Sequence, residues 1–213
     1  MGMYLFVFFC FAPLILCFFV FCMAVRNFKF LYGLWASVLG LVSVIPIALA
    51  QFFILNLPVF TANTLISVLV TAMIFNGLVE ESLKMLCMLL LPSKKVDFPV
   101  FFCMALLLGL ALGCFETVIY LFAGQQEIGL RLVTAVLIHM FCAGLSGIYV
   151  WSFRQRKTKT MPFVLAAVLH GVYNFFAGFS GGYWWFSVVA IAMAALQCRI
   201  WYTKTKQIEI DFT

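Results

Sequence analysis

The sequence predicts an all-α fold, a polytopic membrane protein built as a bundle of about seven transmembrane helices. Of its 213 residues, 66% are hydrophobic and 9% are charged, and the mean hydropathy is +1.17. A soluble domain carries roughly 25% charged residues and could not bury so much apolar surface. The apolar residues form long runs joined by short connections. We therefore expect one integral membrane domain, residues 1–213, with any activity inside the bundle.

Apolar runs interrupted by charged residues, Gly, Pro and Asn define the predicted spans. Each run is long enough to cross a bilayer, which takes about 20 helical residues. The spans are 3–25, 31–55, 64–91, 99–123, 131–153, 161–179 and 183–202. The eight cysteines are scattered through these runs without a Cys-x-x-Cys pair, so we interpret them as small apolar residues and not as a disulfide or zinc framework.

Basic residues follow the first, third, fifth and seventh spans. They are Arg26, Lys29, Lys94, Lys95, Arg154, Arg156, Lys157, Lys159, Lys204 and Lys206. The other connections hold a single basic residue, Arg131. Because short basic loops remain in the cytoplasm, this alternation predicts a multi-pass protein of the cell membrane with its amino terminus outside and its carboxyl terminus cytoplasmic. The net charge of +6 is thus explained by topology, and we expect a lipid bilayer but no nucleic acid as partner.

Ionisable residues inside the predicted spans are the first candidates for function. Each costs about 2.5–3.5 kcal/mol at the centre of a spanning helix, so such residues are rarely kept without a role. They are Glu80, Glu81, Lys84, Glu116, His139 and His170. At 1.5 Å per residue, all fall in the middle part of a core about 30 Å thick. We expect one polar cluster among the helices of residues 64–179, the predicted catalytic core.

The third span carries two adjacent carboxylates and one cation. Lys84 lies one helical turn after both Glu80 and Glu81, so an ion pair within the helix is available. One carboxylate would be enough to neutralise the lysine, and the second adds a desolvation cost. The excess acid is the kind of group that serves as a general base or acid.

The other three polar spans each contribute a candidate. Glu116 ends a stripe of glycines at four-residue spacing, which predicts that it faces a neighbouring helix. His139 lies in the fifth span, and His170 lies in the sixth with Asn174 one turn further on. A lone intramembrane histidine is more often a hydrogen-bonding residue than a catalyst, but the glutamates on neighbouring spans favour a functional role.

Carboxylates, imidazoles and an amide form a set suited to activating water and stabilising an oxyanion. The chain shows no Ser/His, Cys/His or paired-Asp arrangement that would supply a nucleophile. Hydrolysis of a peptide bond within the membrane fits this set. A glutamate would take a proton from water, while a histidine and the Asn174 amide would donate hydrogen bonds to the developing oxyanion.

These residues also resemble a known family, the PrsW-type intramembrane proteases, which are related to the type II CAAX-prenyl proteases. The resemblance covers the third to sixth spans and rests on Glu80-Glu81-x-x-Lys84, Phe115-Glu116 with Tyr120 four residues on, His139, and His170 with Asn174. It implies a membrane-embedded protein as substrate, Glu80 or Glu81 as the water-activating base and Glu116 as a supporting acid. It also implies polarising and oxyanion roles for His139, His170 and Asn174. We favour Glu80 as base because Lys84 shares its face, and Glu81 stays open.

Several alternatives remain at this stage. Two histidines and carboxylates can bind zinc, but their spacing is no local zinc motif, so we expect no cofactor and leave a zinc ion open. The seven-span pattern and two histidines are also similar to Aph-1, a non-proteolytic scaffold subunit of γ-secretase that lacks the full glutamate set. A proton-coupled transporter ranks last, because no inverted repeat is evident. The substrate and the oligomeric state are not predicted.

Overall fold

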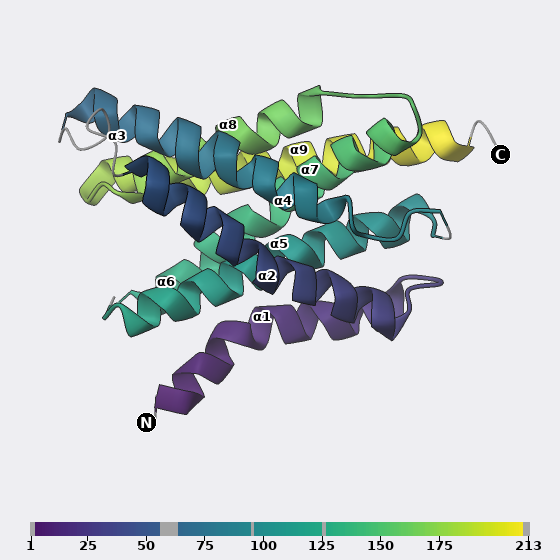
Figure 1. Cartoon of the computed structure of the whole chain (residues 1–213), viewed down its shortest axis with the longest axis horizontal. Coiled ribbons are helices and arrows are strands. Elements are labelled where there is room, and N and C mark those ends of the chain that lie inside the picture. Colours follow the sequence, from purple (N-terminus) through teal and green to yellow (C-terminus); the bar gives the residue numbers. More distant parts are fainter. Residues whose placement is uncertain (1–2, 56–63, 95, 125–126, 211–213) are drawn as a thin grey trace.

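The computed structural model describes residues 3–55, 64–94, 96–124 and 127–210, and within these ranges every regular element is helical (Figure 1). Six stretches are long and apolar enough to cross a membrane, and one further apolar helix is shorter. The prediction of an all-α, multi-pass membrane protein is confirmed. The elements are α1 (Met3–Ala24), α2 (Phe30–Leu55), α3 (Leu65–Thr71), the π-helix η2 (Ala72–Val79), α4 (Glu80–Met88), α5 (Phe98–Phe122), α6 (Ile128–Val133), α7 (Ala135–Arg154), α8 (Met161–Ala177), the 3₁₀ turn η3 (Gly181–Trp184) and α9 (Trp185–Ile210).

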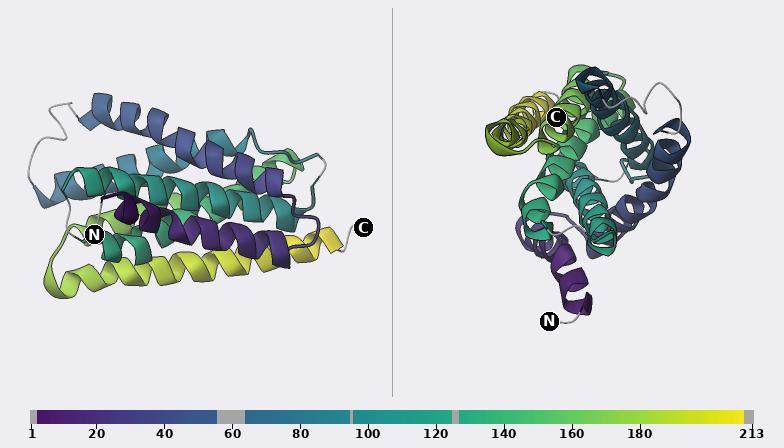
Figure 2. Two further views of the ribbon diagram at one scale, coloured as in Figure 1. Left: turned by 90° about the horizontal axis from the view of Figure 1, so that it is seen from below. Right: turned by 90° about the vertical axis from the view of Figure 1, so that its left-hand side faces the viewer.

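α5 is the central helix of the bundle, and most of its residues are buried. It packs mainly against α7 on one side and α2 on the other, while α1 lies at the edge of the bundle against α5 (Figure 2). α8 packs against η2, α7 and α9. The polar residues predicted from the sequence lie on α4, α5, α7 and α8, so the site is enclosed by the best-packed part of the molecule.

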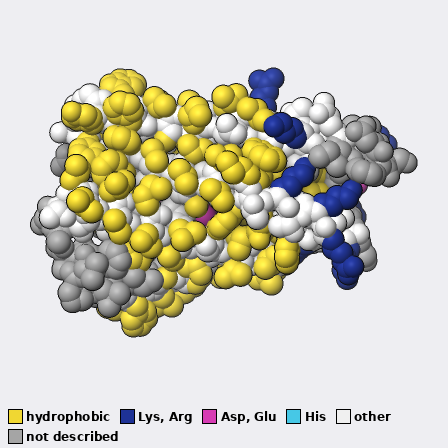
Figure 3. Space-filling view, turned by 90° about the horizontal axis from the view of Figure 1, so that it is seen from above, with side chains coloured by type: hydrophobic (Ala, Val, Ile, Leu, Met, Phe, Trp, Pro, Cys, Tyr) yellow, Lys and Arg dark blue, Asp and Glu magenta, His cyan; other side chains and the backbone are white. Residues whose placement is uncertain are grey.

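The basic connections lie together at one end of the bundle. Figure 1 places the α1–α2, α4–α5 and α7–α8 connections and the end of α9 at this end, and Figure 3 shows Lys and Arg side chains gathered there. Lys95 and the connection 56–63 lie outside the described residues. This segregation is what the charge alternation predicts, and the assignment of this end to the cytoplasm stays a prediction.

The third predicted span, 64–91, is helical but not uniformly α-helical. Its middle, η2, is a π-helix, in which the backbone N–H of Glu80 donates to the carbonyl of Phe75, five residues earlier. Gly77 allows η2 to approach α8 closely, because an added Cβ there would overlap the backbone of Ala167. π-Helical turns are often found at functional sites. Here the turn ends where the two adjacent glutamates begin.

The fifth predicted span, 131–153, is broken. α6 ends at Val133 and α7 begins at Ala135, with Thr134 between them outside the α-helical region, at φ −126° and ψ −69°. The hydroxyl of Thr134 donates to the carbonyl of Leu130 and accepts a hydrogen bond from the hydroxyl of Tyr173 on α8. The break separates the helix that carries Arg131 from the one that carries the catalytic candidates of this span. The last span also runs further than predicted, to Ile210 instead of 202.

Glycines on α5 bring α7 close to it. A Cβ added at Gly109 would overlap the side chain of Ala143 and the backbone carbonyl of His139, and one at Gly113 would lie 3.0 Å from the His139 ring. Small residues at a helix interface permit such close approach in membranes. The glycine stripe therefore fixes the position of His139 relative to α5.

We predict that Gly109→Ala destabilises the protein by about 1–3 kcal/mol, because the new methyl group forces α5 and α7 apart. Gly129→Ala is the matched control, since nothing lies within 4 Å of a Cβ added at Gly129. Thermal unfolding of the two variants in detergent checks the prediction. Equal melting temperatures for both would contradict the proposed contact.

Candidate active site

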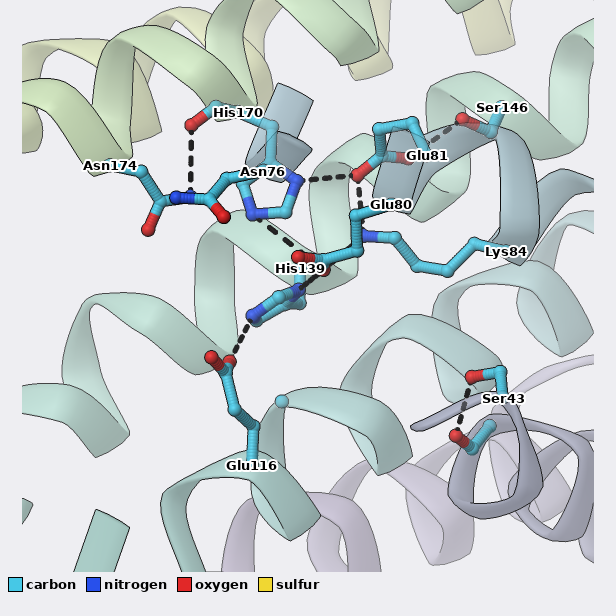
Figure 4. A network of polar contacts seen from close by, with 12 residues as sticks. Ser43, Asn76, Glu80, Glu81, Lys84, Glu116, His139, Ser146, His170 and Asn174 are labelled. Carbon is cyan, nitrogen blue, oxygen red and sulfur yellow. Dashed lines mark hydrogen bonds and ion pairs between the residues drawn. The ribbon is translucent and has the colours of Figure 1, made fainter. Parts of the chain in front are cut away.

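Glu81 is the most completely satisfied group of the site. Its side chain is fully buried and forms an ion pair with Lys84 on the same helix. His170 Nδ1 lies 2.8 Å from Glu81 Oε1, and the Ser146 hydroxyl donates to Glu81 Oε2 at 2.9 Å (Figure 4). Glu81 thus joins α4 to both α7 and α8. Its oxygens are occupied by protein partners, which suits a positioning role.

Glu80 has a different environment from its neighbour. It is buried, and its Oε1 lies 3.1 Å from His139 Nδ1, 3.5 Å from Lys84 Nζ and 3.9 Å from His170 Nε2. None of these approaches has the geometry of a hydrogen bond, so this oxygen has no hydrogen-bond partner in the described structure. A buried polar atom without such a partner is costly and needs an explanation. Glu80 Oε1 is therefore ion-paired but has a hydrogen-bonding capacity that no described protein group fills.

Glu116 and His139 form a direct contact between α5 and α7. His139 Nε2 lies 2.6 Å from Glu116 Oε2, while its Nδ1 faces Glu80 and Lys84, whose Nζ is 3.4 Å away. The His139 side chain is almost fully buried, whereas the Glu116 side chain is 29% exposed. Glu116 is thus the most accessible carboxylate of the three.

The carboxylate contacts also set the orientation of both imidazole rings. With Nδ1 of His170 donating to Glu81, its Nε2 is the nitrogen that faces the site, and this buried nitrogen has no hydrogen-bond partner. With Nε2 of His139 donating to Glu116, its Nδ1 faces the site. The two ring centroids are 4.8 Å apart at an angle of 78°. Carboxylates that hold histidines in this way are typical of metal centres.

Glu80, His139 and His170 could together hold a metal ion. One ligand atom from each lies within 4.8 Å of the others, and all three residues are buried. Two imidazoles and a carboxylate are a ligand set found in catalytic zinc sites. Nε2 of His170 and Oε1 of Glu80 have no hydrogen-bond partner, so their chemistry fits a zinc ion. The third group, His139 Nδ1, lies 3.4 Å from Lys84 Nζ and would exchange that contact for the ion.

Of the predicted residues, Asn174 alone lies outside the network of carboxylate contacts. Its Nδ2 donates to the backbone carbonyl of His170, one turn earlier on α8, at 3.2 Å. It lies beside the site and makes its described hydrogen bond within its own helix. Its expected role at the oxyanion stays a prediction.

The sequence did not assign Arg131 and Ser146 to the site. Arg131 Nη2 lies 3.5 Å from Glu116 Oε2, and its guanidinium carbon lies 3.6 Å from the centre of the Tyr120 ring. In the sequence, Arg131 is the single basic residue in the connections that the charge pattern places outside the cell. This departure from the alternation was the one signal that could have drawn attention to it. Ser146 lies two turns after His139 on α7, a spacing that places them on one face.

The structure is an all-helical membrane bundle in which glutamates and histidines converge from four helices, a residue set suited to hydrolysis within the membrane. Comparison with family models identifies it further. A model described as PrsW family intramembrane metalloprotease matches residues 29–197, and the chain belongs to this family. It is therefore an intramembrane protease, as the sequence resemblance implied. Searches of curated proteins and of solved structures gave no match.

We predict that Glu81→Gln destabilises the protein more than Glu80→Gln does. Glu81 neutralises Lys84 directly and also holds two other helices, so its loss should cost about 3–5 kcal/mol, the usual effect of breaking a buried ion pair. Glu80 Oε1 has no hydrogen bond to lose and its ion pair with Lys84 is longer, at 3.5 Å, so its substitution should cost less than half as much. Thermal unfolding of both variants in detergent measures the difference. A larger loss for Glu80→Gln would show that we have exchanged the two roles.

Proposed function

We propose that this protease hydrolyses a peptide bond of a membrane-embedded protein with water activated at Glu80. The observation that carries the proposal is the buried Glu80 oxygen without a hydrogen-bond partner, which faces His139 and His170. Glu80 also lines a pocket of about 180 Å³, from which water and substrate can reach it. Family membership supports the proteolytic activity, and the contacts of the site support the choice of this residue.

Glu80 is a better candidate for the base than Glu81. Both oxygens of Glu81 are engaged by protein groups, and a water molecule would have to displace one of them. A water molecule at Glu80 Oε1 would displace no hydrogen bond, although it would have to enter among His139, Lys84 and His170. Since the two residues are adjacent on one helix, their environments alone separate their roles, as is common for paired carboxylates.

The roles proposed for the remaining residues follow from their contacts. Glu81 orients His170 and, with Glu80, balances the charge of Lys84. Glu116 holds His139 through its Nε2, and the Nδ1 of the same ring faces Glu80. The proton that Glu80 takes from water would pass through His139 to Glu116, which as the most accessible carboxylate is placed to deliver it to the leaving amine. In the absence of a metal, His139 and His170 would donate hydrogen bonds to the scissile carbonyl as imidazolium ions, protonated at the nitrogens that face the site. The Asn174 amide would join them at the oxyanion by releasing the His170 carbonyl.

We further propose that Glu80, His139 and His170 hold a zinc ion. When bound, such an ion polarises the carbonyl and lowers the pKa of water. With Oε1 bound to the ion, Glu80 would accept the proton through its second oxygen, Oε2, in place of Oε1. The description of the family as metalloproteases supports zinc over the cofactor-free expectation.

We expect Glu80→Gln to lower the cleavage rate at least 100-fold, by the usual size of a general-base contribution (roughly 10²–10⁴), while the protein stays folded. Membrane-protein fragments are compared between cells with the wild type and cells with the variant. Ser82→Ala is the control on the same helix, because the Ser82 hydroxyl bonds only to the carbonyl of Leu78 among the described contacts. If Glu80→Gln keeps wild-type cleavage, the assignment of the base is wrong. Loss of a protein complex without any accumulated substrate would favour a scaffold.

The metal proposal predicts that zinc co-purifies with the wild type and is lost from Glu80→Gln and His170→Gln. Removing one ligand of three weakens binding strongly, and outer partners alone account for about 10–100-fold in affinity. Zinc content is measured by mass spectrometry on purified, folded protein, with Asn174→Ala as the variant that keeps its zinc. Full cleavage activity after complete removal of the metal would refute the proposal.

A further inference from the structure

The pocket next to Glu80 is bounded by three elements: α2, α5 and, through Glu80, α4. We call it the α2–α5 cleft; its α2 wall consists of Val44, Ile47, Ala48 and Gln51, and α5 residues form the opposite wall. Glu80 and Glu116 also belong to its lining. Figure 3 shows that the face of the bundle seen there is covered mostly by apolar side chains, away from the end where Lys and Arg gather. The cleft combines apolar walls with two carboxylates.

The size of the cleft restricts what can enter it. Its volume of about 180 Å³ is below the range of roughly 300–1,000 Å³ that is typical of small-molecule sites. An α-helix with its side chains is about 10–12 Å across, and a whole helix does not fit. A stretch of about one or two extended residues, each about 3.3 Å long, is the largest part of a substrate that this volume admits. Peptide hydrolysis also requires an extended stretch, because the scissile carbonyl must be free of its helical partner.

Extended backbone in a membrane needs new hydrogen-bond partners. Each unsatisfied N–H or C=O in hydrocarbon costs several kcal/mol, so the enzyme must supply them. The lining of the cleft contains one neutral amide, Gln51. Its Nε2 lies 3.5 Å from Asn76 Oδ1 on η2, at the upper limit for a hydrogen bond, and it can exchange this weak contact for a better one.

We propose that the α2–α5 cleft binds a short extended stretch of a membrane-spanning substrate, which enters from the lipid, and that Gln51 binds the backbone of this stretch. The proposal rests on the function proposed above and adds the route of entry and the recognition of the substrate. The apolar walls would contact the side chains of the substrate, and the Gln51 amide would form a hydrogen bond with its backbone. The scissile bond is thereby brought to Glu80 and Glu116, which line the same cleft.

Photo-cross-linking tests binding without cleavage. The probe is a synthetic single-span peptide of about 20 leucine and alanine residues with a central Gly-Gly pair and a photo-leucine beside it, in liposomes with the Glu80→Gln protein. Glycine weakens a helix, so this peptide can unwind at its centre. We expect attachment within residues 44–51 and 112–120, mapped by mass spectrometry, and weaker attachment for a peptide with Ala-Ala in place of Gly-Gly. Attachment on other faces of the bundle overturns the proposal.

Two variants of adjacent residues provide the matched control. Ala48→Trp fills the cleft and should reduce cross-linking about tenfold or more, whereas Leu49→Trp adds the same bulk at a lipid-exposed position outside the lining and should not. Gln51→Leu should reduce cross-linking about tenfold, by the cost of an unsatisfied backbone group, whichever apolar side chains flank the glycines. Thermal unfolding shows that each variant is folded.

Cleavage by the corresponding variants in the wild-type background separates this proposal from the proposed function. Cleavage of the Gly-Gly peptide that persists in folded Ala48→Trp overturns the cleft and leaves the protease assignment intact. Cross-linking in the cleft by a wild-type protein that cleaves neither peptide supports the cleft as a binding site and counts against the function.

Discussion

The free-energy cost of charged groups in lipid is the constraint on which this structure depends. The ammonium group of Lys84 is completely buried, and it is tolerated only because Glu81 and Glu80 lie beside it. The surplus negative charge in turn requires the imidazoles from α7 and α8. Four helices are thus held together by one network, and their arrangement cannot change without separating charges in a medium of low dielectric constant.

The same network divides two adjacent carboxylates into different roles. Consecutive residues on a helix point about 100° apart, so Glu81 is directed to Ser146 and His170, and Glu80 is directed to the space between the two histidines. One carboxylate completes the packing of the bundle, while the other keeps an oxygen free. The interior can hold a reactive carboxylate at Glu80 because the contacts of Glu81 stabilise the bundle.

The sequence predicted the helices and the clustering of the ionisable residues, because both leave signals that survive without tertiary structure. Long apolar runs define spans, and ionisable residues within them are too costly to be accidental. The π-helical turn of η2 and the break at Thr134 were not predicted, because hydropathy carries no information about which carbonyl accepts the hydrogen bond of each backbone N–H. Nor could the sequence decide between Glu80 and Glu81, whose difference arises entirely from partners on other helices. Arg131 joins the site through the folded position of α6.

A protease buried in lipid must select its substrates by a property that varies from one apolar helix to another. Their side chains are much alike, and the walls of the α2–α5 cleft offer little to distinguish one aliphatic residue from another. Membrane-spanning substrates do differ in how easily their helices unwind, by about 1 kcal/mol for each Ala replaced by Gly. A narrow cleft with a backbone-binding amide converts this difference into selectivity, because only an unwound stretch fits and only an exposed backbone is bound. Local helix stability of the substrate then contributes directly to the barrier for cleavage.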